Sequence, residues 1–169
     1  MARLGWLGLA LAATCCSSVP ASAQEAMAST GDWQYGADDE LAAASTRNDQ
    51  GALFGLVCSP DCIGFIQSNQ ACVPGRIYDG IMRSLGREDR MPLECQRVGG
   101  RFALLFTPTS AFVETLRNGP QVTVFVRLIG TTDTAFRFSL NGAYDAIYIT
   151  LATAVAASNQ TPDVQTPGL

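Results

Sequence analysis

The residues in this chain best suited to chemistry are its cysteines. Six occur, and Cys58, Cys62, Cys72 and Cys95 lie in the body of the sequence, with 3, 9 and 22 residues between them. An even number of cysteines in an exported protein predicts disulfides, here two. Zinc ribbons use paired C-x2-C knuckles, and redox dithiols use C-x-x-C, whereas this chain has one looser C-x3-C pair. We therefore expect two disulfides and no metal site.

The turn residues around the cysteines favour one pairing. Ser59-Pro60-Asp61 would turn one strand into the next, which places Cys58 opposite Cys62 at a cross-strand distance that a disulfide tolerates. The strand that starts at Cys62 leads away from that end, so Cys72 is expected to pair with Cys95. The alternative, Cys58–Cys95 with Cys62–Cys72, stays open because connectivity cannot be deduced from sequence alone.

Histidine and lysine are both absent. Catalysis by Ser-His-Asp or Cys-His and metal sites containing histidine are therefore excluded. Two carboxylate clusters remain as candidates for a hydrolase, Asp38-Asp39-Glu40 and Glu88-Asp89. A glycosidase-like pair must face each other across a cleft, and both clusters are more simply explained as solvated loop charge. We expect a protein that is not an enzyme and has no cofactor.

The first 23 residues are typical of a cleavable secretory signal. Arg3 precedes an apolar run over residues 4–13, and Ala21-Ser22-Ala23 provides small residues for cleavage after Ala23. The run is about 10 residues long, too short to span a membrane. A second Ala-x-Ala begins at Ala26, and Cys15 and Cys16 leave a lipoprotein as an alternative. The protein is expected in the periplasm or outside the cell.

The elements expected to position these residues form one small domain. Residues 24–39 are small and polar and predict a loose segment, residues 40–157 a single β-rich domain, and residues 158–169 a disordered tail. The domain is mainly β (α+β), an antiparallel sheet or sandwich of about seven short strands. Thr107-Pro108 predicts a helix over 108–118, and Asn141 would cap a second over 142–156. The charged stretch Leu85–Arg90 is expected to be a loop.

Charge and aromatic content limit the class of partner. After cleavage, 146 residues remain with a net charge of −5, which argues against binding nucleic acid. No later stretch is apolar and long enough to span a membrane. Trp33, Tyr35, Phe65 and Tyr78 could line a ligand groove, although such residues more often pack within a sheet. We expect a protein partner in the envelope or outside the cell.

Several motifs resemble those of a known family. Four of them follow one another in order in the second half of the chain. They are Cys95 after Pro-Leu-Glu, a helix ending Leu116-Arg117-Asn118-Gly119, a strand over 122–126, and Phe138-Ser139-Leu140-Asn141-Gly142 before a helix containing Ala146. Together with the opening Gly31-Asp32-Trp33, they resemble the invasion-associated locus B proteins of bacteria. The family's second cysteine in this half is missing near Arg101. The resemblance implies a non-enzymatic envelope or secreted protein of a Gram-negative bacterium, with the matched motifs acting structurally.

Three functions are compatible with these features. The leading hypothesis is an exported, disulfide-bonded, non-enzymatic binding or structural protein, with an association with invasion implied by the resemblance. The alternatives are an accessory or immunity protein of a secretion system and a periplasmic hydrolase that uses carboxylates. Paired carboxylates facing each other across a deep cleft would favour the hydrolase. A flat surface with an exposed apolar patch would favour binding.

Overall fold

The computed structural model describes residues 27–38, 41–59, 61–128 and 133–160, a mainly β domain with two helices. This confirms the β-rich class. The predicted leader and its cleavage after Ala23 lie outside the described residues. The elements are β1 (Ala28–Thr30), β2 (Trp33–Ala37), β3 (Ala42–Arg47), β4 (Leu53–Ser59), β5 (Asp61–Ser68), β6 (Ile77–Ser84), β7 (Arg87–Val98), β8 (Arg101–Phe106), α1 (Ser110–Asn118), β9 (Gln121–Val126), β10 (Thr134–Ser139) and α2 (Ala143–Gln160).

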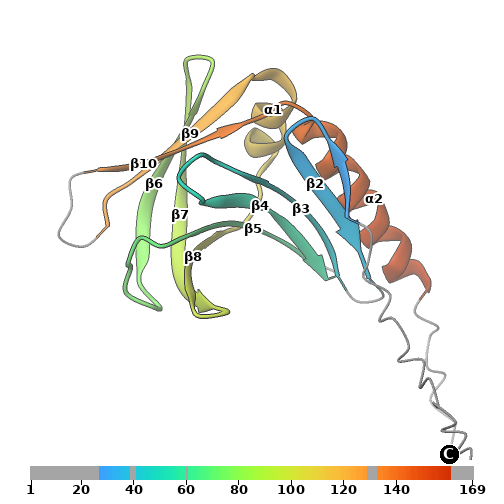
Figure 1. Ribbon diagram of the computed structural model, residues 1–169, viewed down its shortest axis with the longest axis horizontal. Coiled ribbons are helices and arrows are strands. Elements are labelled where there is room, and N and C mark those ends of the chain that lie inside the picture. The colour runs from blue at the N-terminus through green and yellow to red at the C-terminus, as the bar shows by residue number, and fades with distance from the viewer. Residues whose placement is uncertain (1–26, 39–40, 60, 129–132, 161–169) are drawn as a thin grey trace, which may run out of the picture.

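All the described strands belong to a single antiparallel sheet (Figure 1). Its ten strands follow the order β1-β2-β3-β4-β5-β8-β7-β6-β9-β10, so the expected count of about seven was too low. The sheet curls strongly, but β1 and β10 do not pair with each other, and the sheet is not closed into a barrel. Both helices pack on one side of the curl.

The N-terminal segment expected to be loose instead contributes the first two strands. β1 pairs with β2, and β2 pairs with β3 from Trp33↔Thr46 to Ala37↔Ala42. The cause is Trp33, whose side chain is fully buried and donates its indole N–H to the carbonyl of Ser139 at 3.0 Å. A polar segment with one such anchor is ordered by a contact more than 100 residues away in sequence.

The stretch Leu85–Arg90, expected to be a loop, is part of a long hairpin. Leu85 and Gly86 adopt positive φ values of 45° and 75°, the geometry of a tight two-residue turn. β7 begins directly afterwards, and Arg83 pairs with Glu88 in register, with a 2.7 Å hydrogen bond from Nε to the carboxylate. The charges that predicted a loop therefore belong to strand residues, and the side chains of Arg87, Glu88 and Arg90 are exposed.

One face of the curled sheet carries the core. The ring of Phe54 is buried and lies 4.9–6.2 Å, between centroids, from the rings of Trp33, Phe106, Phe112 and Phe138. These five rings come from β2, β4, β8, α1 and β10. The cluster therefore ties both ends of the sheet to its centre and to the first helix.

Both predicted helices are present, with shifted ends. α1 begins at Ser110 rather than at Pro108, because the Thr109 side chain caps the helix by accepting the N–H of Phe112 at 3.1 Å. α2 begins at Ala143 and is preceded by Gly142, so the expected cap at Asn141 was wrong. Residues 158–160 were expected in the tail but belong to α2, and residues 161–169 lie outside the described part.

Two disulfides lie on the core side of the sheet. Cys58 is bonded to Cys62, which faces it directly in the β4–β5 register, and Cys72 is bonded to Cys95 of β7. This is the pairing that the meander of strands favours. Cys58, Cys72 and Cys95 are buried, so both bonds are part of the packed interior.

Candidate functional site

A groove of about 890 Å³ lies between the two ends of the curled sheet. Its volume is within the range typical of ligand sites. β2, β3 and β4 form one wall, and β9 and β10 form the other. The lining is mostly polar and includes Gln34, Ser45, Arg47, Gln121, Thr123 and Arg137. These side chains alternate along their strands with buried core residues, so the groove lies on the outward face of the sheet.

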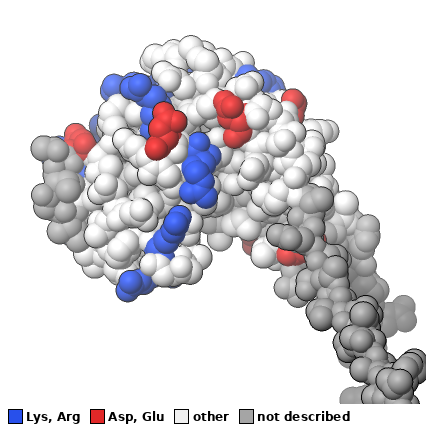
Figure 2. All heavy atoms as spheres, viewed as in Figure 1, with Lys and Arg blue, Asp and Glu red and all other residues white. Residues whose placement is uncertain are grey.

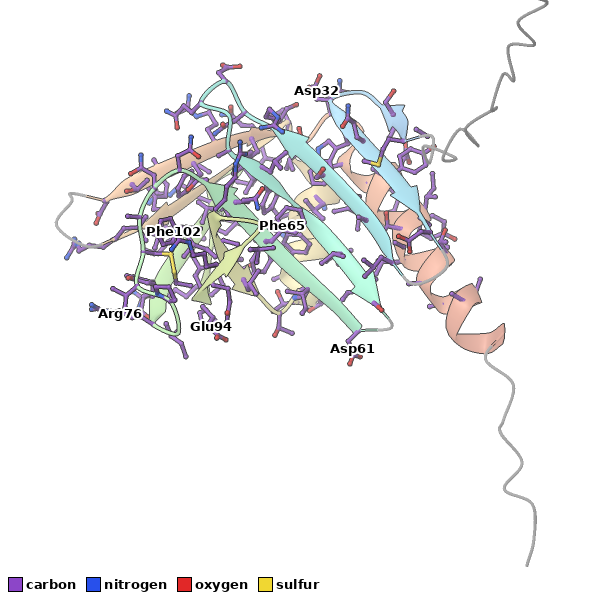
Figure 3. The ribbon with its side chains drawn as sticks, turned by 60° about the horizontal axis from the view of Figure 1, so that its bottom comes forward. Asp32, Asp61, Phe65, Arg76, Glu94 and Phe102 are labelled. Carbon is purple, nitrogen blue, oxygen red and sulfur yellow. A yellow bond between two sulfur atoms is a disulfide. The ribbon has the colours of Figure 1, made fainter. Side chains whose placement is uncertain are left out.

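An interlocked joint holds the two walls at one end. We call it the corner joint and define it as Gly31–Trp33, in the β1–β2 turn, together with Ser139–Gly142, between β10 and α2. The N–H of Asp32 donates to the Asn141 carbonyl at 3.0 Å, and the Ser139 hydroxyl donates to the Asp32 carboxylate at 2.6 Å. Figure 3 shows Asp32 at the turn that leads into β2.

Close backbone approach completes the corner joint. Gly142 has a φ of 83°, and a Cβ added there would collide with the carbonyl oxygen of Thr30 and lie 3.0 Å from the nitrogen of Gly31. β3 is tied to the same turn, since the Thr46 hydroxyl donates to the Asp32 carbonyl at 2.8 Å. The joint thus brings together the two stretches, Gly31-Asp32-Trp33 and Ser139-Leu140-Asn141-Gly142, that carry much of the family resemblance.

The register of β9 and β10 determines which backbone groups face the open edge of the sheet. The N–H of Leu140 donates to the carbonyl of Pro120 at 2.9 Å, continuing the ladder of the two strands. In an antiparallel ladder, alternate residues direct their N–H and C=O toward the neighbouring strand. Leu140, Phe138 and Phe136 therefore direct their backbone N–H and C=O toward β9. Ser139, Arg137 and Ala135, which alternate with them, direct these groups away from β9, toward the open edge.

Only one of these edge groups has a partner among the described residues. The Ser139 carbonyl accepts the indole N–H of Trp33, as expected for a residue that directs its carbonyl away from β9. The backbone N–H and C=O of Ala135 and Arg137 have no hydrogen-bond partner in the part of the chain that the structure describes. Both residues are exposed and both line the groove. The groove therefore runs beside a short, unpaired strand edge.

The charged groups of the groove differ in how they are engaged. The Asp32 carboxylate accepts the Ser139 hydroxyl, and an Arg47 guanidinium nitrogen donates to the Gly51 carbonyl at 3.0 Å. Asp49 is exposed at the tip of the β3–β4 hairpin. The Arg137 guanidinium has no ion-pair or hydrogen-bond partner among the described residues, so it is a free cation beside the open edge. On the face shown in Figure 2, basic and acidic side chains are interspersed.

The acidic clusters proposed as catalytic candidates are placed differently by the structure. Asp38 turns the chain between β2 and β3, its carboxylate accepting the N–H of Leu41 at 2.6 Å, while residues 39 and 40 lie outside the described part. Glu88 pairs with Arg83 on the solvent side. Asp89 follows Glu88 on the same strand and points to the opposite face, so these two carboxylates do not face each other.

The four aromatic candidates do not line the groove. Trp33 and Tyr78 are buried, and Tyr35 packs against the core. Phe65 lies half-buried on the outward face of β5 (Figure 3). The groove's outward-facing aromatic residue is Phe125 of β9, which sequence reasoning missed as a site residue. The signal that could have found it is an apolar residue at position 125, on the strand face opposite Val122, Val124 and Val126.

Neither a metal-binding cluster nor a membrane-spanning helix occurs among the described residues. Within the described ranges, no three acidic or cysteine side chains come together in a way that could hold a metal ion. In that same part of the chain, neither helix has the length and apolar character needed to cross a bilayer.

Comparisons with known proteins place the fold. No family of sequences and no curated protein matches the chain. Among solved structures, it is similar to the crystal structure of invasion associated protein b from Bartonella henselae, with a TM-score of 0.54 and 10% sequence identity. The match covers 80% of this chain and 99% of that one. The chain therefore shares its fold with that protein, a distant relationship at the level of architecture.

Proposed function

We propose that this protein is an exported, disulfide-bonded binding protein of the bacterial envelope or exterior, and that it acts by contact with a protein partner rather than by catalysis. The observation that carries the proposal is the polar groove beside the unpaired edge of β10. Exposed strand edges bind other polypeptides, and natural proteins usually protect them. Here Ala135 and Arg137 leave theirs open at the side of a groove.

The two disulfides support the exported location. Disulfides persist in the periplasm and outside the cell and are rare in the cytosol, where thiols are kept reduced. The signal-like sequence that ends at Ala23 supports the same compartment. The name of the structural neighbour, invasion associated protein b, supports a role at the surface that meets a host.

Site-specific photo-crosslinking in cells tests the proposal. Gln34→p-benzoylphenylalanine places the crosslinker on an exposed position that lines the groove. Asp61→p-benzoylphenylalanine is the matched control, because Asp61 is exposed at the opposite end of β4 and β5 (Figure 3). We expect an ultraviolet-dependent adduct with one protein from position 34 and none from position 61.

The identity and location of the adduct decide between the hypotheses. An envelope or surface protein bound at position 34 supports the proposal, and a toxin or secretion-system component would assign the accessory or immunity alternative. The absence of an adduct from position 34 in oxidised, exported protein would contradict a binding role for the groove. Recovery of the protein from the cytosol with intact Met1 would contradict export.

A further inference from the structure

We propose that the open edge of β10 binds an extended, acidic segment of the partner by β-strand addition, so that the segment becomes an eleventh strand. This inference rests on the proposed function and names how the groove recognises its partner. Strand addition obtains affinity from main-chain hydrogen bonds and specificity from alternate side chains. The structure provides free main-chain groups at Ala135 and Arg137 and an exposed charged side chain at Arg137.

The main-chain groups are already arranged for an additional strand. Ala135 and Arg137 each direct an N–H and a C=O toward the open edge. Phe136 and Phe138, which alternate with them along β10, direct their N–H and C=O toward β9. The end of the edge at Ser139 is fixed by the corner joint, where its carbonyl accepts the Trp33 indole. An incoming strand can therefore pair with Arg137 and Ala135 without disturbing any existing hydrogen bond.

The free guanidinium of Arg137 determines the chemistry of the segment. A residue placed opposite Arg137 would have its Cβ about 5 Å away on the same face, within reach of an ion pair. The Asp32 carboxylate, which also lines the groove, already accepts a hydrogen bond from the Ser139 hydroxyl. The Arg47 guanidinium lies on the same groove wall as Asp49. A glutamate or aspartate opposite Arg137 is therefore favoured over a lysine or arginine.

The same charge argues against a second copy of this chain as the occupant. Two β10 edges that pair about a two-fold axis centred at Arg137 would place the two arginines directly opposite each other. Like charges in that position destabilise a strand pair. An extended peptide segment with a carboxylate at the centre has no such conflict.

Short peptides provide a direct test on the oxidised protein. The probe is acetyl-Thr-Val-Glu-Val-Thr-amide, compared with the same peptide carrying lysine at the centre. Binding is measured by ¹⁵N NMR titration and by amide hydrogen exchange. We expect the glutamate peptide to bind about tenfold more tightly than the lysine peptide, and Arg137→Glu to reverse that preference. We also expect slower exchange at the amides of Ala135 and Arg137 when the peptide is bound.

Backbone variants separate strand addition from binding through side chains. Ala135→Pro removes an N–H that faces the open edge and leaves the bonds to β9 intact, so we expect weaker peptide binding with retained fold. Ala135→Gly is the matched control. In an antiparallel addition, the arrangement of every strand pair in this sheet, N-methylation of the glutamate blocks the peptide edge that pairs with Arg137, whereas N-methylation of either valine blocks the other edge. Only N-methylation of the glutamate should abolish binding.

The outcomes are distinct from those of the crosslinking test. Peptide binding without protection of the Ala135 and Arg137 amides, or equal binding of both N-methylated peptides, would overturn strand addition. Failure of every peptide to bind at millimolar concentration would overturn it as well. In each case an adduct from position 34 would still support a protein-binding groove.

Discussion

Replacing Gly142 with alanine tests the corner joint, which holds one end of the groove together. Gly142 has a φ of 83°, and an alanine Cβ would collide with the carbonyl oxygen of Thr30 across the joint. A suitable control is Gly51, whose φ is 78° but which has no atom within 4 Å of the added Cβ. The two variants therefore share the conformational penalty and differ in the collision.

The magnitudes follow from these two effects. A left-handed conformation is less favourable by about 1–2 kcal/mol for alanine, so Gly51→Ala should lower the free energy of unfolding by about that amount. At Gly142 the backbone must also move to admit a methyl group, and overpacking of this kind typically adds about 1–3 kcal/mol. We therefore expect Gly142→Ala to be about 2–5 kcal/mol less stable than the unsubstituted protein.

Urea unfolding followed by tryptophan fluorescence measures this difference. Trp33 donates to Ser139 within the corner joint, and the chain's other tryptophan, Trp6, lies in the predicted leader. In the cleaved protein the fluorescence therefore reports on the joint itself. If Gly142→Ala and Gly51→Ala have free energies of unfolding within about 0.5 kcal/mol of each other, the close approach of Thr30 to Gly142 is refuted, because only that collision distinguishes the two sites.

Three other predictions concern the disulfides, metal content and export. Removing the Cys72–Cys95 bond by a double alanine substitution should lower stability by about 3 kcal/mol, and removing Cys58–Cys62 by about 2 kcal/mol, because the first closes the longer loop. Non-reducing peptide mapping checks the pairing, and a fragment joining Cys62 to Cys72 would contradict it. Elemental analysis of oxidised protein should find less than one zinc per chain, and stoichiometric zinc after dialysis would contradict the disulfide interpretation. N-terminal sequencing of periplasmic protein should begin within a few residues of Gln24.

The sequence predicted the parts of the fold that depend on neighbouring residues. The Ser59-Pro60-Asp61 turn put Cys58 opposite Cys62, and the helix expected over 142–156 corresponds to α2. Each of these features is set by residues within about one turn of chain. The β-rich class followed from the same local alternation of apolar and polar side chains.

The parts that could not be predicted depend on residues distant in sequence. β1 and β2 are ordered because Trp33 and Asp32 bond to Ser139, which lies 106 and 107 residues further along the chain. The long hairpin of β6 and β7 also requires neighbouring strands that bury the inward half of each strand. Local composition carries no signal for either effect, so polar and charged stretches were expected to be loops.

The candidate site was the least predictable feature. The groove exists because β2–β4 and β9–β10 meet through the curl of a sheet whose strand order is not sequential. Arg137 lies on a strand that alternates polar and apolar residues, and its residue type alone does not mark it as a site residue. Its unpaired guanidinium and the free backbone beside it follow from the sheet's ending at β10, which no pattern of residue types specifies.

The corner joint also limits when the chain can finish folding. Its two halves are more than 100 residues apart, so the bonds that join Trp33 and Asp32 to Ser139 cannot form until Ser139 has been synthesised. At 5–20 residues per second, ribosomal elongation imposes a delay of about 5–20 s. The first two strands remain without their anchor throughout that interval. During that interval the N-terminal strands lack the contacts with β10 and with the turn before α2 that complete the corner joint.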